Sequence, residues 1–134
     1  GAISFGYSSN MTLTANGTAE KPILFTFQTS GTWIGLRFYS RVQSSSLLNY
    51  CTVEYAGTYS TAAIEFRGTK ININNCTIRN SKTTGIYSDT DQFGFVTFNN
   101  NTISNNGSHA LILKALPCFL KDRESEFAWA GLKA

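Results

Sequence analysis

The sequence has 134 residues, enough for one domain, and only 14% of them are charged. The net charge of +3 comes from Lys and Arg residues scattered singly, so no basic patch predicts nucleic-acid binding. No apolar run reaches the roughly 18 residues that a membrane-spanning helix needs, so no membrane span is predicted.

Short apolar stretches follow one another along the chain. Within each stretch, apolar and polar residues alternate, which is the period of a β-strand. Turn-forming Asn, Gly and Ser residues separate the stretches. In chain order, the predicted strands are Ile23–Phe27, Gly35–Phe38, Ser46–Leu48, Cys51–Val53, Ala63–Glu65, Ile71–Ile73, Cys76–Ile78, Gly85–Tyr87, Val96–Phe98, Asn101–Ile103 and Ala110–Ile112.

A three-residue sequence motif recurs every 25 residues, as Cys51–Val53, Cys76–Ile78 and Asn101–Ile103. A fixed period of this length indicates a repeat architecture. Three short strands in one repeat cannot pair with one another across corners, so each pairs with its equivalent one repeat later. The sequence therefore predicts an all-β fold, a single-stranded parallel β-helix of three parallel sheets. We expect about four to five coils of about 25 residues within residues 1–115.

The alternation also predicts which side chains face the core and which face outward. Outward positions include a threonine column and two oppositely charged pairs on neighbouring coils, Arg37 with Glu65 and Glu54 with Arg79. The threonine column comprises Thr26, Thr52, Thr77 and Thr102. The predicted inward set comprises Phe25, Leu36, Phe38, Leu48, Val53, Ile64, Phe66, Ile71, Ile73, Ile78, Ile86, Val96, Phe98, Ile103 and Leu111.

Cys51 and Cys76 occupy equivalent places in successive repeats, and Asn101 takes that place in the third. We interpret the cysteines as stacked buried thiols; a disulfide is the alternative. A polar side chain in an inward column predicts that Asn101 bonds to backbone or faces a corner.

Residues 116–134 differ in composition from the repeats. Phe119, Leu120, Phe127 and Leu132 fall at helical intervals, so an amphipathic helix is predicted over about 119–132. A solenoid's last coil exposes its core and strand edges, so we interpret this segment as a cap; the alternative is a partner-binding helix.

Two parts of the chain resemble right-handed parallel β-helix proteins of the pectate-lyase-like superfamily, in particular the bacterial surface or secreted group. Leu13–Thr26 with Trp33–Phe38 resembles that group's first coil, and Leu48–Gly57 with its repeats resembles its running coils. The resemblance implies a right-handed solenoid. It also implies an extracellular or cell-surface location in a bacterium, with the cytoplasm as the alternative.

The sequence favours a non-catalytic protein without cofactor or metal. Lyases and hydrolases of the resembled superfamily use clustered Asp residues on adjacent coils, but here Asp89 and Asp91 are the only acidic pair of that kind. Their spacing is compatible with calcium binding or with a solvated turn. No catalytic residue is therefore assigned. A polysaccharide lyase or glycoside hydrolase remains the alternative function.

Aromatic residues in or near the irregular loops indicate a binding surface instead. Tyr59, Tyr87, Phe93 and Phe95, together with Asp89 and Asp91, are the predicted ligand-binding residues, and a polysaccharide or a cell-surface partner is the expected ligand. Phe93 and Phe95 could equally pack under a loop or at a subunit interface. A short solenoid with no recognisable N-terminal cap further predicts a homo-oligomer, formed through the solenoid ends.

Overall fold

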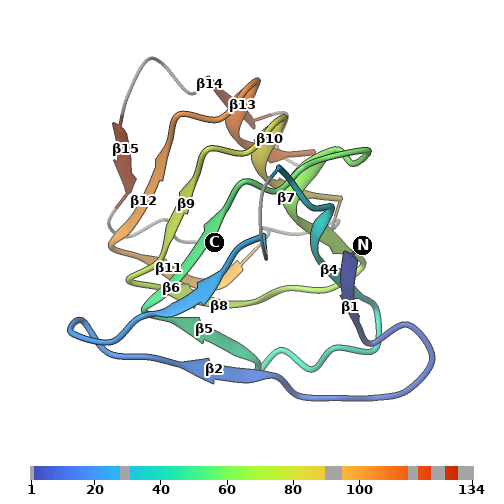
Figure 1. Ribbon diagram of the computed structural model, residues 1–134. Coiled ribbons are helices and arrows are strands. Elements are labelled where there is room, and N and C mark those ends of the chain that lie inside the picture. Colours follow the sequence, from blue (N-terminus) through green and yellow to red (C-terminus); the bar gives the residue numbers. More distant parts are fainter. Residues whose placement is uncertain (1, 28–30, 90–94, 115–117, 122–125, 130–134) are drawn as a thin grey trace.

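The computed structural model describes residues 2–27, 31–89, 95–114, 118–121 and 126–129. Its strands form three sheets that wind around one core (Figure 1). The first sheet contains β1 (Ala2–Phe5), β4 (Gly35–Tyr39), β7 (Ala62–Arg67), β10 (Thr84–Ser88), β13 (His109–Leu113) and β14 (Cys118–Lys121). The second contains β2 (Thr14–Asn16), β5 (Leu47–Asn49), β8 (Ile71–Asn74) and β11 (Phe95–Asn99). The third contains β3 (Ile23–Phe25), β6 (Cys51–Glu54), β9 (Thr77–Arg79), β12 (Asn101–Ser104) and β15 (Glu126–Trp129).

The predicted parallel solenoid is confirmed. From β1 to β13 every strand pairs in parallel with its equivalent one coil away, and the second sheet spans about three turns. The three-residue motif that recurs every 25 residues lies in register on successive coils, because Thr52 pairs with Thr77 and Thr77 pairs with Thr102. Among the described residues no helix is long and apolar enough to cross a membrane.

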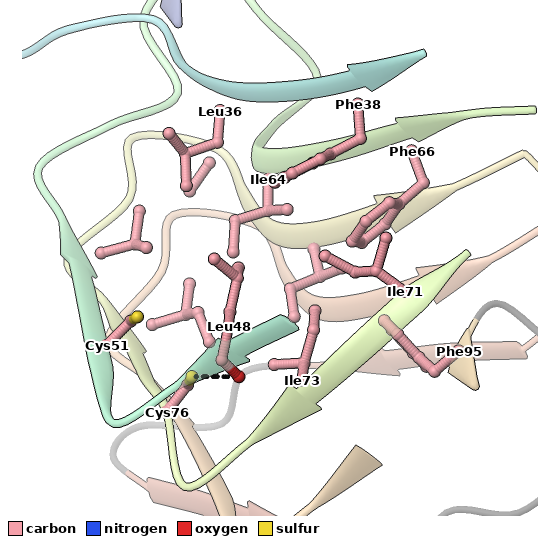
Figure 2. Close-up of a cluster of buried hydrophobic side chains, with 14 of the residues drawn as sticks. Leu36, Phe38, Leu48, Cys51, Ile64, Phe66, Ile71, Ile73, Cys76 and Phe95 are labelled. Atoms are coloured by element: carbon pink, nitrogen blue, oxygen red, sulfur yellow. Dashed lines mark hydrogen bonds between the residues drawn. The ribbon is translucent and has the colours of Figure 1, made fainter. Parts of the chain in front are cut away.

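The core is one cluster of apolar side chains, stacked from coil to coil and enclosed by the three sheets, part of which Figure 2 shows. Most of the predicted inward residues are fully buried there, while Phe25 on the first coil is half-buried. An aromatic stack runs through the core. The Phe38 and Phe66 rings stack at 5.1 Å, and Phe66 meets Phe95 edge-on at 5.8 Å.

The prediction that Val96 faces inward is wrong. A bulge between Phe95 and Thr97 shifts the register, so that Phe95 pairs with Ile71 and Thr97 with Asn72. Phe95 therefore takes the core position and is 2% exposed, whereas Val96 is 45% exposed. The larger apolar side chain occupies the buried site.

The predicted threonine column is correct for three of its four members. Thr52 pairs with Leu24 rather than Thr26, because β3 is offset by two residues from the expected alignment. Thr26 instead donates a hydrogen bond to Glu54 at 3.1 Å, so it stands beside the Glu54–Arg79 pair.

Asn side chains hold the corners between coils. Asn75 and Asn100 have φ angles of 55° and 57°, a left-handed conformation that Asn adopts more readily than most residues. The Asn75 side chain donates to Asn49, which donates in turn to Asn16, at 2.9 and 2.8 Å. These bonds link successive coils at one edge of the solenoid.

Cys51 and Cys76 are buried free thiols, as predicted. Each thiol donates to a backbone carbonyl of the preceding coil at 3.4 Å, Cys51 to Ala15 and Cys76 to Leu48. Figure 2 shows the bond from Cys76 to Leu48. The neighbouring Cys51 thiol raises the pKa of Cys76, and burial raises it further. Asn101 bonds to backbone, as predicted, and is fully buried.

The predicted C-terminal helix is wrong for the described part of that segment. Cys118–Lys121 and Glu126–Trp129 form β14 and β15, which pair antiparallel with β13 and β12. The last coil leaves the N–H and C=O groups of β12 and β13 without a partner on one side. An added strand satisfies these groups directly, which a helix cannot do.

Candidate functional site

A cleft of about 670 Å³ lies on the outer side of the first sheet. Its floor is formed by the charged residues Arg37 of β4 and Glu65 and Arg67 of β7, which alternate with inward-facing core residues. Its wall is the loop 57–61 between β6 and β7, together with Lys82 and Thr83 before β10. Three neighbouring coils therefore build the cleft.

The loop wall is fixed by bonds to the coils on both sides. The Gly57 N–H donates to Ile34 O at 3.0 Å, and the Lys82 N–H donates to Ala56 O at 2.8 Å. Gly57 has a φ of 90°, and a Cβ atom there would lie 2.6 Å from the Ser81 hydroxyl oxygen. Glycine is thus required both for the backbone conformation and for the close approach of the next coil.

Glu65 is a buried carboxylate between two arginines. Its side chain is 1% exposed, and its Oε1 accepts a hydrogen bond from Arg67 Nη2 at 2.8 Å. Its Oε2 lies 3.0 Å from Arg37 Nε, an ion-pair contact whose angles are not those of a hydrogen bond. The bond to Glu65 raises the pKa of Arg67 above its ordinary value, so this guanidinium remains charged.

The two predicted charge pairs are confirmed. Arg37 pairs in register with Glu65, and Arg79 Nη2 lies 2.9 Å from Glu54 Oε2 on the outer side of the third sheet. The two pairs differ in burial, because Arg79 is about half-exposed and Glu54 keeps some access to solvent. Of these two pairs, Arg37–Glu65 is the one that lines this cleft.

Of the predicted ligand-binding residues, Tyr59 lies at the cleft. It lines the loop wall, is 94% exposed and has a φ of 55°. Tyr87 lies in register beside Glu65 but does not line the cleft; the Arg67 guanidinium lies over its ring, 5.5 Å from the centroid. Cation–π contact with Tyr87 helps to hold the Arg67 side chain in place.

Among the described residues, the predicted ligand-binding residues Asp89 and Phe95 do not line the cleft. Asp89 Oδ1 accepts a hydrogen bond from the Gly68 N–H at 2.8 Å and so ties two coils together. Phe95 is not a surface residue, because the bulge turns it into the core. Asp91 and Phe93 lie outside the described residues. In the described part of the chain, no three His, Cys, Asp or Glu side chains are grouped to hold a metal ion.

Sequence reasoning did not identify Arg67 and Lys82 as cleft residues. A signal for Arg67 was available, since it lies two positions after Glu65 and so shares its face of the strand. Lys82 has no such signal. It reaches the cleft because the turn before β10 stacks against the loop of the previous coil.

The three-sided parallel arrangement with an outer cleft defines this protein as a β-helix solenoid. Residues 1–115 match the family described as the right handed beta helix region, and the chain belongs to that family. Comparisons with curated proteins and with solved structures found no match.

Proposed function

We propose that the protein is a non-catalytic module that binds a saccharide in the cleft beside the first sheet. The observation that carries this proposal is the combination of an exposed Tyr59 ring with the polar floor of Arg37 and Arg67. An aromatic face packs against a sugar ring, and guanidinium groups donate hydrogen bonds to sugar oxygens. The volume of about 670 Å³ is within the usual range of small-molecule sites.

The burial of Glu65 and its pairing with two arginines support saccharide binding rather than saccharide hydrolysis. Glycoside hydrolysis ordinarily uses two carboxyl groups that reach opposite sides of the scissile bond. Among the described residues, Glu65 is the one carboxylate lining this cleft, and it is buried between Arg37 and Arg67. A lyase or hydrolase remains the alternative, and turnover of a bound polysaccharide would establish it.

Tyr59→Ala is expected to weaken saccharide binding at least about fivefold, corresponding to about 1 kcal/mol of lost ring contact. The measurement is retention on affinity gels and calorimetric titration with the polysaccharide that is retained. Tyr7→Ala is the matched control, since Tyr7 is also a highly exposed tyrosine but lies outside the cleft. Equal loss in both variants, or no retention of the native protein on any glycan, would contradict the proposal.

We also propose self-association through the N-terminal end of the solenoid. In the described residues, β1, β2 and β3 each pair on one side only, and their coil exposes Ile3 and Leu24. Unpaired edges with apolar side chains favour pairing with a second copy.

Sedimentation at tens of micromolar is expected to show a dimer, and Leu24→Lys is expected to shift the protein toward monomer. A charge on an edge strand opposes strand pairing, while Leu24 is exposed enough for the fold to tolerate it. A native protein that sediments only as a monomer would exclude this second proposal.

A further inference from the structure

The charges that reach the open side of the cleft are positive. In the described part of the chain, three cations, Arg37, Arg67 and Lys82, line it together with one carboxylate, Glu65. The side chains of Arg37 and Arg67 are 29% and 44% exposed and Lys82 is exposed, whereas Glu65 is 1% exposed. A ligand in the cleft therefore meets the cations, while the negative charge lies beneath them.

The buried carboxylate also fixes the arginines. Glu65 engages Nη2 of Arg67 and contacts Nε of Arg37, whereas each guanidinium carries five N–H donors. Arg67 is held a second time by the Tyr87 ring. The two guanidiniums are thus ordered before a ligand arrives, which reduces the entropy lost on binding.

Other charged groups of the described residues near this face do not make the cleft negatively charged. Asp89 lies close enough to Arg67 to favour its charged form, but the Asp89 carboxylate is engaged by the Gly68 N–H and does not line the cleft. Glu54 lies on the third sheet with Arg79. No other acidic side chain lines the cleft among the described residues.

We propose that the cleft recognises an anionic group of the saccharide, a carboxylate, sulfate or phosphate, and that Glu65 is a positioning residue that orients Arg37 and Arg67 toward it. Guanidinium groups match the planar, multidentate geometry of these oxyanions. This inference rests on the proposed saccharide binding but adds the charge of the ligand and the role of Glu65.

The first test compares matched oligosaccharides of equal length that are neutral, carboxylated, sulfated or phosphorylated, together with inorganic sulfate, in calorimetric titrations. At least one anionic oligosaccharide is expected to bind about tenfold or more tightly than the neutral one, and higher salt is expected to weaken its binding. The rank order of the three anionic sugars identifies the anionic group that the cleft recognises.

Equal affinity for neutral and anionic sugars, with loss of that affinity in Tyr59→Ala, would overturn the charge inference and support the proposed function. Binding of sulfate without binding of any saccharide would support the anion site and contradict the proposal that the ligand is a saccharide.

The second test separates positioning from simple charge. Arg67→Gln is expected to weaken binding of the anionic sugar about tenfold, while the matched control Arg79→Gln, which breaks a pair on another sheet, leaves it unchanged. Glu65→Gln makes the cleft more positive, so a role limited to charge predicts tighter anion binding. Positioning predicts weaker binding, by about tenfold, and tighter binding would overturn this role.

Folding is monitored by thermal melting of each variant. Should Glu65→Gln fail to fold, Lys82→Gln tests the anion site, because Lys82 is exposed and its removal spares the floor. A several-fold loss of affinity for the anionic sugar, with unchanged affinity for the neutral one, is expected. Unchanged affinity for both would overturn the anion site.

Discussion

Phe66→Ala is expected to lower the free energy of unfolding by about 3–5 kcal/mol, a large part of the 5–15 kcal/mol typical of a domain. Phe66 is fully buried, stacks on Phe38 of the previous coil and meets Phe95 of the next. Figure 2 shows its ring between these coils in the core. Its removal leaves a cavity that three backbone-paired coils cannot collapse to fill.

Urea unfolding followed by circular dichroism measures this loss, and Val96→Ala is the matched control. Val96 is 45% exposed, so its truncation is expected to cost less than about 1 kcal/mol. The pair of variants also tests the bulge in β11. If Val96→Ala were as destabilising as Phe66→Ala, Val96 would lie in the core and the bulge would be absent.

Most of the core could be predicted because the repeat imposes it. A strand fixes the alternation of its side chains, and in-register pairing then places Val53, Ile78 and Ile103 in one column. An error of one residue would expose a whole column to water, so the apolar pattern constrains the register strongly. This constraint explains why the inward set is correct over most of its length.

The errors occur where the repeat is broken. Four apolar or small residues follow one another from Phe93 to Val96, and alternation alone cannot decide whether Phe95 or Val96 is buried. In the tail, the spacing of Phe119, Leu120 and Phe127 fits a helix, but the open edges of β12 and β13 favour strands.

The cleft was only partly predictable, since its parts come from three coils. Arg37 and Glu65 could be paired from equivalent repeat positions, and Tyr59 could be chosen as a loop aromatic. The burial of Glu65 and the approach of Lys82 depend on how the loop 57–61 folds over the sheet. Loop length varies between repeats, so the period carries no information about that fold.

Asn101→Leu is expected to lower the free energy of unfolding by about 2–4 kcal/mol, despite the similar size and greater hydrophobicity of leucine. Asn101 Oδ1 accepts from the Cys76 N–H, and its Nδ2 donates to Ile73 O, both at 2.9 Å. Leucine satisfies neither backbone group, and a buried unsatisfied group costs about 1–3 kcal/mol. Urea unfolding measures the loss.

Asn101→Cys is the matched control, because it restores the residue type of the two preceding coils. Cys76 donates to Leu48 O, the in-register equivalent of Ile73 O, so a thiol at position 101 is expected to reach Ile73 O in the same way. It still leaves the Cys76 N–H without the Asn101 oxygen, so we expect an intermediate stability, about half the loss seen with leucine. Equal stability of the leucine variant and the native protein would mean that this column needs only apolar volume. The predicted order, native above cysteine above leucine, would instead show that asparagine ends the cysteine ladder by supplying a strong oxygen acceptor, where a thiol offers only a weak one.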